Sequence, residues 1–287
     1  MRDQADKLRE LVNNKGISYD HELRIYSIVS GKGGVGKTNF TVNLAIKLQQ
    51  LGKKVLILDA DIGMSNVNIL MDIDAKHTLL DLLQGKLELE DIIYTGPAGV
   101  DFISGGAELL NLGSVDEERQ KEIISSLSNL GKYDVLLIDN GAGISKETLM
   151  YMVLADEIIL VTTPEPTALA DAYRVLKAVS LSKLKNNVKV VVNQIPDYNS
   201  GLDAYNKLYK TSLQFLKVTV ESLGYIFSDI RVNKAIMEQY PFVLSYPNSL
   251  ASDGINQICM SILGDEDKRI NLSGIKQFSN RLIKLFG

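Results

Sequence analysis

The sequence predicts an α/β fold in which a mostly parallel, twisted sheet is flanked by helices. Three observations support this prediction. Apolar runs that suit buried strands recur along the 287 residues, at 25–29, 55–58, 100–104, 133–139, 158–162, 188–193 and 225–227. Stretches with helical spacing of apolar residues lie between several of them. A glycine-rich turn connects the first run directly to a helical stretch, as in α/β folds that bind phosphate groups.

The composition excludes several classes of protein. Apolar residues make up 45% of the chain and charged residues 23%, which is ordinary for a soluble globular protein. The net charge of -4 gives no support to a nucleic-acid surface over the whole molecule and disfavours DNA binding, with a local basic patch as the open alternative. The single cysteine, Cys259, lies in an apolar helical pattern and excludes a multi-cysteine metal site within one chain. No apolar run reaches the length of a membrane span, and we expect a cytoplasmic location.

The glycine-rich turn is the stretch Ser30–Thr38, Ser-Gly-Lys-Gly-Gly-Val-Gly-Lys-Thr. It fills every fixed position of the phosphate-loop pattern and lies between a strand and a helix predicted at 39–51, which disfavours a chance match. Its glycines let successive backbone N–H groups face one polyphosphate, and Lys37 supplies a point charge. The threonine hydroxyl can ligate Mg²⁺. The predicted nucleotide contacts are Gly33, Gly34, Val35, Gly36, Lys37, Thr38 and Asn39.

A second lysine, Lys32, lies inside the loop where the general pattern leaves the residue free. In one interpretation it is a solvated loop lysine. The stretch Lys-Gly-Gly-Val-Gly-Lys-Thr nevertheless resembles the deviant phosphate loop of the MinD/ParA family of ATPases. The resemblance implies a P-loop NTPase fold of the SIMIBI type, ATP hydrolysis, and an ATP-dependent homodimer. In that dimer Lys32 reaches the partner's ATP, and Lys32 and Lys37 are both catalytic.

Three carboxylates end two of the predicted strands. Asp59 and Asp61 follow the run 55–58, and Asp139 closes the run 133–139 in the form of a Walker B strand. The carboxyl end of a strand is where an open α/β sheet places ligand chemistry, although a capping and a turn aspartate would look the same. The family resemblance implies that Asp61 orients the attacking water. It also implies that Thr38, Asp59 and Asp139 surround Mg²⁺.

Two asparagines extend this predicted site. Asn140 opens the stretch Asn-Gly-Ala-Gly, whose glycines suit a γ-phosphate sensor. Asn140 is a departure from the family pattern with no effect that the sequence alone explains. Asn193 ends a strand and resembles the adenine-reading asparagine of the family, with a turn asparagine as the alternative. Gln194 departs from the basic residue that often follows, and the segment 228–233 resembles the one that closes over adenine.

The remaining helices are predicted from apolar spacing alone. Short helical pieces are expected at 79–83 and 87–93, and a longer amphipathic helix at 116–130. The stretch from 197 to 223 is expected to be largely helical. These segments carry no candidate site residue.

The N-terminal stretch, residues 2–12, has the pattern of an amphipathic helix. Such a helix could simply pack on its own core. The stretch Asp3–Arg9, Asp-Gln-Ala-Asp-Lys-Leu-Arg, resembles the activator element of FlhG, the flagellar branch of the MinD/ParA family. The resemblance implies that this helix activates the GTPase FlhF, with Gln4 inserted toward the nucleotide and with Leu8 and Arg9 as docking contacts.

The C-terminal stretch, residues 274–287, is also amphipathic. Lysine and arginine lie on its polar face, as in helices that lie in a membrane interface. Its predicted membrane-facing residues are Ile275, Phe278, Leu282, Leu285 and Phe286. An ordinary helix packed on its own sheet would give the same pattern. The resemblance to the MinD and FlhG targeting sequence favours anionic lipid on the inner face of the cell membrane.

The resulting prediction divides the chain into five parts. These are an activator helix at 1–15, a linker at 16–23, the ATPase domain at 24–264, a linker at 265–273 and the targeting helix at 274–287. The resemblance implies an ATP-driven switch that controls flagellar number and placement with FlhF, and flagellar switch or C-ring proteins as further partners. A MinD-type division-site ATPase, a ParA-type DNA-partitioning ATPase and a scaffold without turnover remain alternatives.

Overall fold

The computed structural model describes residues 23–61, 67–106, 108, 109, 112, 116, 120, 122, 123, 126–266, 281 and 282. The predicted activator helix and almost all of the linker at 16–23 lie outside these residues. The strands are β1 (Arg24–Val29), β2 (Val55–Ala60), β3 (Ile93–Thr95), β4 (Asp101–Ile103), β5 (Val135–Asn140), β6 (Glu157–Thr162), β7 (Asn187–Ile195) and β8 (Thr219–Phe227). The α-helices are α2 (Lys37–Gln50), α3 (Val67–Leu70), α4 (Leu79–Leu83), α6 (Lys146–Leu154), α7 (Pro166–Leu181), α8 (Tyr198–Phe215), α9 (Ile230–Met237), α10 (Phe242–Ser245) and α11 (Leu250–Glu266).

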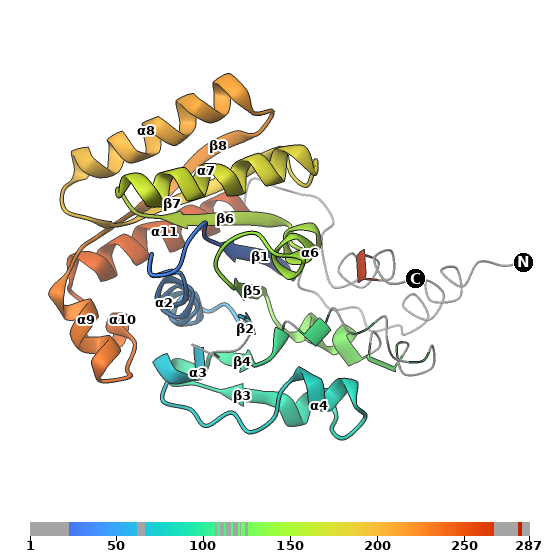
Figure 1. The fold of residues 1–287 in the computed structure, drawn as a ribbon. Helices are drawn as coiled ribbons and strands as arrows, with labels where there is room; N and C mark the ends of the chain where they lie inside the picture. The colour runs from blue at the N-terminus through green and yellow to red at the C-terminus, as the bar shows by residue number, and fades with distance from the viewer. Residues whose placement is uncertain are drawn as a thin grey trace, which may run out of the picture.

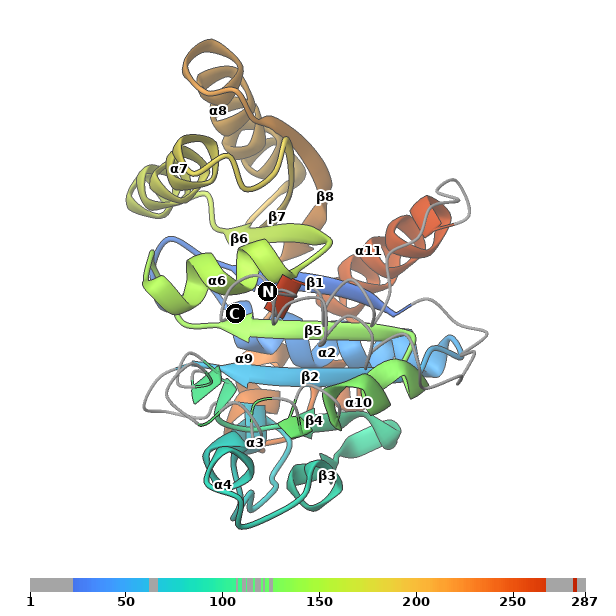
Figure 2. The same ribbon diagram turned by 90° about the vertical axis from the view of Figure 1, so that its right-hand side faces the viewer.

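The described strands form one sheet in the order β3-β4-β2-β5-β1-β6-β7-β8 (Figure 1). Every neighbouring pair is parallel except β3 and β4. Strands β2, β5 and β1 run side by side at its centre (Figure 2). Since β5 is inserted between β2 and β1, three strand ends that are far apart in the sequence meet at one edge. The fold class predicted from the sequence is confirmed.

Helices cover both faces of the sheet, because side chains of a buried parallel strand point alternately to either side. Helices α2, α10 and α11 bury one apolar cluster against β1, β2, β5 and β6. Helices α4 and α6 bury a second cluster on the opposite face, and α7 and α8 bury a third against β6, β7 and β8. An open α/β sheet binds its ligand at the edge formed by the carboxyl ends of its strands.

Local sequence signals set several helix ends. Thr78 begins α4 with a capping box whose partner is Asp81. Ser145 and Asp197 accept backbone N–H groups at the starts of α6 and α8. Pro166 occupies the first turn of α7, where its missing N–H costs nothing. These caps fix where each helix starts relative to the strand before it.

The structure corrects the expected boundaries in three places. At the end of the helix expected at 116–130, Ser128–Lys132 form a 3-10 helix. The helix expected from 197 to 223 ends at Phe215, and residues 219–223 belong to β8. The β-branched run Val218-Thr219-Val220 favours a strand, and β8 gains backbone hydrogen bonds along β7 that a longer helix would forgo. The helical piece expected at 87–93 is a 3-10 helix at Leu89–Ile92, and Ile93 opens β3.

The two described residues of the C-terminal stretch lie against the core. Leu282 is fully buried in the cluster that α4 and α6 share. Arg281 donates to the carbonyl of Leu154 and lies 2.9 Å from the carboxylate of Asp156. Lys185 donates to the carbonyl of Ala155, and burial and the charge of Arg281 lower its pKa. The other predicted membrane residues, Ile275, Phe278, Leu285 and Phe286, lie outside the described residues.

Cys259 lies in α11 and is buried, as the apolar pattern predicted. Burial raises the pKa of its thiol to about 12, so it remains a neutral, apolar side chain near pH 7. Within the described ranges, no helix has both the length and the apolar character that a membrane crossing needs.

Candidate functional site

The predicted nucleotide site lies where β1, β2 and β5 end. Asp59 and Asp139 are direct neighbours in the pairing of β2 with β5, and Asp139 is also the register partner of Ile28 in β1. The phosphate loop starts two residues after Ile28 and leads into α2. Parallel pairing therefore brings together residues that lie about 20 to 110 positions apart in the sequence, and the loop and both carboxylates share one edge of the sheet.

The backbone of the phosphate loop requires glycine at several positions. Gly34 and Gly36 adopt φ values of 81° and 82°, a left-handed conformation that other residues enter only with strain. At Gly31 a Cβ atom would overlap the backbone of Asp171 and Ala172 in α7. A Cβ atom at Gly36 would also overlap the amide nitrogen of Asn193, so Gly31 and Gly36 allow a close approach and Gly34 and Gly36 allow the backbone geometry. The loop can then aim its N–H groups and the N-terminus of α2 at a phosphate.

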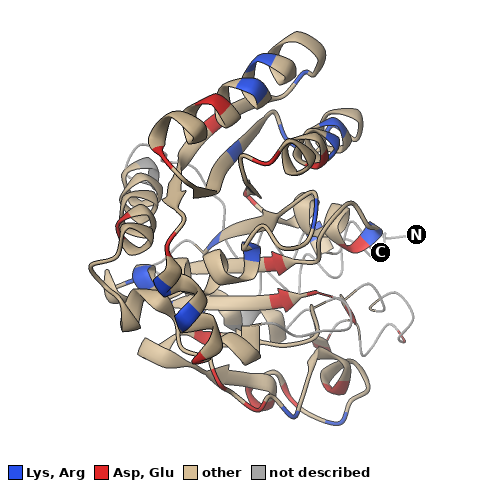
Figure 3. Cartoon of the chain, turned by 60° about the vertical axis from the view of Figure 1, so that its left-hand side comes forward, with Lys and Arg blue, Asp and Glu red and all other residues tan. Residues whose placement is uncertain are grey.

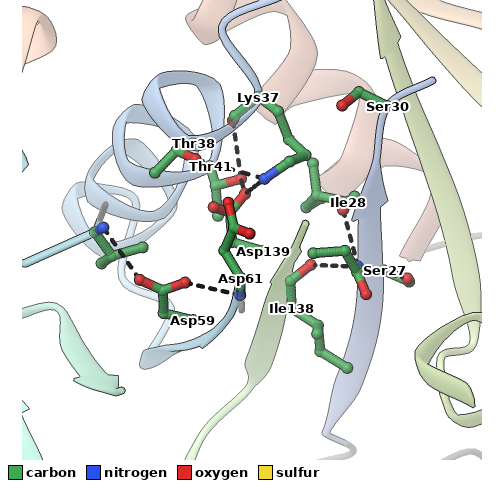
Figure 4. Close-up of polar contacts among 12 residues, drawn as sticks. Ser27, Ile28, Ser30, Lys37, Thr38, Thr41, Asp59, Asp61, Ile138 and Asp139 are labelled. Atoms are coloured by element: carbon green, nitrogen blue, oxygen red, sulfur yellow. Dashed lines mark hydrogen bonds and ion pairs between the residues drawn. The ribbon is translucent and has the colours of Figure 1, made fainter. Parts of the chain in front are cut away.

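Lys37 and Asp139 form a buried ion pair at the base of the loop. The Nζ atom of Lys37 lies 2.9 Å from Oδ1 of Asp139, and the side chains are 7% and 0% exposed (Figure 4). The hydroxyl of Thr41 donates to the same oxygen at 2.8 Å. Two donors on one buried carboxylate oxygen hold the charge of Asp139 and fix the ammonium of Lys37 beside the loop.

The donor set fits a magnesium ion. The second oxygen of Asp139, Oδ2, is buried and has no hydrogen-bond partner among the described residues. Thr38 and Asp59 lie at the same edge, and all three side chains offer oxygen atoms, which Mg²⁺ prefers. The oxygens of Asp59 accept the backbone N–H groups of Asp61 and Val67, each at 3.2 Å. A metal held by one or two carboxylates and a hydroxyl matches this arrangement.

Asp61 lies at the start of the predicted first switch segment. Its carboxylate faces Gly141 after β5, since a Cβ atom at Gly141 would lie 3.0 Å from its Oδ1 atom. Figure 4 shows Asp61 beside Asp139 and close to Lys37. The structure therefore brings the predicted water-orienting carboxylate to the same edge as the phosphate loop. Residues 62–66 of the segment lie outside the described residues.

Lys32 points to a different element from Lys37. Its Nζ atom lies 2.7 Å from the carboxylate of Glu165 and 3.2 Å from the hydroxyl of Thr167, at the N-terminus of α7. The Lys32 side chain is 32% exposed and that of Glu165 is 64% exposed. The sequence analysis missed Glu165 and Thr167, which lie more than 130 positions from Lys32. The only local sign was the Pro-Glu-Pro turn that starts α7.

Asn193 and Gln194 lie beneath the loop. The amide nitrogen of Asn193 donates to the carbonyl of Val35 at 2.8 Å, and its amide oxygen accepts the backbone N–H of Gln194. Gln194 has a φ of 56°, and its side-chain amide nitrogen donates to the carbonyl of Gly34 at 3.4 Å. Both side chains thus hold the backbone of the phosphate loop through its carbonyl groups. Adenine reading by Asn193 remains a prediction, because both of its amide atoms contact this chain's own backbone.

Further predicted site residues are the three N-terminal ones and Asn39. Gln4, Leu8 and Arg9 lie outside the described residues. Asn39 is partly buried in the first turn of α2, where its carbonyl and side-chain oxygen accept the amide of Asn43. No group of three or more histidine, cysteine, aspartate or glutamate side chains that could hold a metal ion occurs in the described part of the chain. A metal here would therefore need oxygen atoms from the nucleotide or water as well.

Comparisons with known proteins agree with this geometry. A ParA family model, described as the NUBPL iron-transfer P-loop NTPase, matches residues 23–263. The antiactivator FleN of Pseudomonas aeruginosa is 33% identical, with 84% of this chain and 87% of FleN aligned. The flagellum site-determining protein YlxH of Helicobacter pylori is 31% identical over the full length of both chains.

Solved structures give the same result for the fold. The septum site-determining protein MinD of Pyrococcus horikoshii, complexed with Mg-ADP, superposes with a TM-score of 0.67 at 28% identity. The match covers 87% of this chain and all of that one. The single cysteine of this sequence, Cys259, is buried.

Proposed function

The chain belongs to the MinD/ParA family of P-loop ATPases, and on that premise we propose that it is an ATP-driven dimerisation switch controlling flagellar number and placement. Members of this family hydrolyse ATP, and this chain has the loop and the carboxylates for the reaction. The names of FleN and YlxH support the flagellar role, as does the FlhG-like stretch Asp3–Arg9. A division-site role like that of MinD is the main alternative.

The observation that carries the proposal is the divergence of the two lysines in one loop. Lys37 is buried against Asp139, where it can serve the chain's own nucleotide. Lys32 is partly exposed and held by Glu165 and Thr167 on α7. An exposed ion pair is weak and exchanges readily, so Lys32 can leave Glu165 for the phosphates bound by a second copy.

The described residues then have separate tasks in hydrolysis. The loop backbone and Lys37 bind the phosphates and neutralise their charge. Magnesium, which Thr38, Asp59 and Asp139 would hold, supplies electrostatic stabilisation of the phosphate oxygens. Asp61 orients the water that attacks the γ-phosphate, and the glycines at 141 and 143 allow the backbone beside it to respond to that phosphate. Loss of the γ-phosphate removes the contacts that join the two copies.

Membrane attachment follows from dimerisation in this proposal. One short amphipathic helix binds a bilayer weakly, whereas two helices on one dimer gain affinity through effective concentration. Leu282 is buried against the core here, so its use on a bilayer requires that it leave this position. The N-terminal stretch would activate FlhF through Gln4. A comparison of FlhF GTPase activity with native protein and with a chain lacking residues 1–12 tests that part.

Sedimentation with anionic vesicles tests the switch. Native protein is expected to pellet with the vesicles in ATP and to remain in the supernatant in ADP. Lys32→Ala is expected to remain in the supernatant in both, because the copies no longer close on each other's nucleotide. Its stability should stay within about 1 kcal/mol of native, since the pair that it removes is exposed.

Two results would contradict the switch. One is pelleting of native protein to the same extent in ATP and ADP. The other is a Lys32→Ala variant that pellets and hydrolyses ATP like native protein. Lys54→Ala, at the opposite end of the sheet, is the control for loss of a lysine charge.

A basic surface on α7 and α8 supports an acidic protein partner such as a flagellar switch protein. Residues 172–187 and 204–220 contain no aspartate or glutamate, although the whole chain has a net charge of -4. Both helices show blue and also red segments in Figure 3, since Asp171 lies in α7 and Asp203 in α8, outside the two stretches without acidic residues. A cavity of about 340 Å³ lies between them, lined by Leu169, Tyr173, Leu208 and neighbouring residues. Leu213 and Phe215, at the end of α8, are 70% and 65% exposed. A segment with acidic and apolar residues would match this surface.

Charge reversal on this surface should weaken binding of the acidic flagellar partner protein to this chain. Lys177→Glu combined with Lys210→Glu is expected to raise the Kd at least about 10-fold, with a larger effect at low salt. Lys234→Glu on α9 is the matched control, because it changes an exposed lysine on a different helix. Isothermal titration at two salt concentrations measures this, and equal losses in both variants would rule out the surface.

A further inference from the structure

Asn140 is the last residue of β5, beside the metal-binding candidate Asp139. Successive residues of a strand point to opposite faces of the sheet, so Asp139 faces α2 while Asn140 faces the side that α6 covers. Asn140 is 1% exposed. Its side chain therefore belongs to neither the phosphate loop nor the solvent, and the hydrolysis scheme above gives it no task.

The amide nitrogen of Asn140 connects two strands. It lies 3.0 Å from the hydroxyl oxygen of Ser27, 2.9 Å from the carbonyl of Ile28 and 3.1 Å from the carbonyl of Ile138. Figure 4 labels these three partner residues, Ser27, Ile28 and Ile138. The register of β1 with β5 ends at the pair Ile28–Asp139. The amide thus adds a cross-strand contact where the backbone pairing stops.

The amide orientation is fixed by these partners. The carbonyls of Ile28 and Ile138 accept hydrogen bonds only, so an exchange of the amide nitrogen and oxygen would place three acceptors together. The amide oxygen of Asn140 is buried without a hydrogen-bond partner among the described residues. A buried orphan acceptor costs free energy. The chain keeps this arrangement, which indicates that the donor contacts matter at this position.

The segment that Asn140 holds is the one next to Asp61. Gly141 follows directly. A Cβ atom at this position would lie 3.0 Å from the Asp61 carboxylate, so glycine leaves room for that carboxylate. Two residues later, the backbone N–H of Gly143 donates to the carbonyl of Ser30 at 2.8 Å. The segment 141–143 is therefore fastened at both ends, to β1 by the Asn140 side chain and to Ser30, the first residue of the phosphate loop, by Gly143.

We propose that Asn140 is a positioning residue for ATP hydrolysis. It fastens the start of segment 141–143 to β1, so that Gly141 keeps the Asp61 carboxylate at a fixed place beside the γ-phosphate. The inference uses the ATPase reaction alone and does not depend on the membrane or flagellar role. It also gives a physical reason for Asn140, which, like Gln194, departs from the family pattern.

Steady-state kinetics and nucleotide binding test the proposal together. Asn140→Leu keeps the number of side-chain heavy atoms and their branching but removes the donor, and kcat is expected to fall about 10- to 100-fold, the cost of a small misplacement near the reacting atoms. The Kd for ADP should change less than about twofold, because the phosphate loop is untouched. Asn140→Ser restores one donor to a strand carbonyl and should recover part of kcat.

Asn187→Leu is the matched control. Asn187 opens β7 at the other end of the sheet, and its amide oxygen is likewise buried without a partner among the described residues. This variant should change thermal stability but leave kcat of the folded protein near native. The proposal is wrong if Asn140→Leu retains native kcat. It is also wrong if kcat, ADP affinity and thermal stability fall together and serine recovers none of them, because that pattern shows general damage. Vesicle binding in ATP tests the switch separately.

Discussion

Asp61→Ala is expected to lower kcat for ATP hydrolysis about 100- to 1,000-fold while leaving ATP binding intact. The Asp61 carboxylate lies beside Gly141 and Asp139, but it takes no part in the Lys37–Asp139 ion pair. Its removal therefore takes away the group that orients water and leaves the phosphate contacts in place. Phosphate release under saturating ATP measures the loss, and binding of a fluorescent ATP analogue measures what remains.

The same variant should accumulate as an ATP-bound dimer, because the step that separates the copies is blocked. Light scattering in ATP is expected to give twice the monomer mass, and in ADP the monomer mass. Asp74→Ala is the control, since its carboxylate is 84% exposed and lies 3.9 Å from the ammonium of Lys76 instead of in the predicted site. A solitary Asp61→Ala chain at saturating ATP would refute the role of the γ-phosphate in pairing. Native-like turnover would remove Asp61 from the mechanism.

Asp139→Ala is expected to damage both stability and catalysis. The substitution leaves the ammonium of Lys37 buried without its carboxylate, and breaking a buried pair in this way costs about 3–5 kcal/mol. The hydroxyl of Thr41 loses one of its two acceptors and keeps the carbonyl of Lys37. Hydrolysis should fall below detection, because the oxygen offered to magnesium is gone. Urea unfolding without nucleotide measures the first effect and phosphate release the second.

A double variant separates the two effects. Lys37→Met combined with Asp139→Leu removes both charges and fills similar volume, so most of the lost stability should return. Hydrolysis should remain absent, because both the phosphate-binding charge and the metal ligand are missing. If the urea midpoint of unfolding of Asp139→Ala equals that of native protein, the buried ion pair makes no net contribution to stability. If the double variant hydrolyses ATP, neither side chain is part of the site.

The phosphate loop could be predicted because its chemistry is local. All of its fixed positions lie within nine residues, and the strand before it and the helix after it are visible as apolar patterns. Asp59, Asp61 and Asp139 were predictable for a related reason: each follows an apolar run that suits a buried strand, and parallel strand ends meet at one edge. The structure places all three at that edge.

The limits of helix α8 and the position of Leu282 were not predictable in the same way. Residues 219–223 become a strand because β7 offers an open edge to pair with, and a single-chain pattern does not contain that edge. Leu282 fits an apolar helix face equally well on a bilayer or on the core, and in the structure it is buried with α4 and α6. Amphipathic spacing identifies the apolar face but not what covers it.

The sequence alone determined the chemistry of this protein: a phosphate loop with an additional lysine, and carboxylates that follow buried strands. The tertiary structure decided which of these groups meet. It pairs Lys37 with Asp139, holds Lys32 on Glu165, and turns Asn140 under β1, across separations of 102, 133 and 113 residues. The physical reason is that loop and strand signals depend on neighbouring residues, whereas ion pairs and buried amides depend on strand order and register, which the whole sheet sets at once.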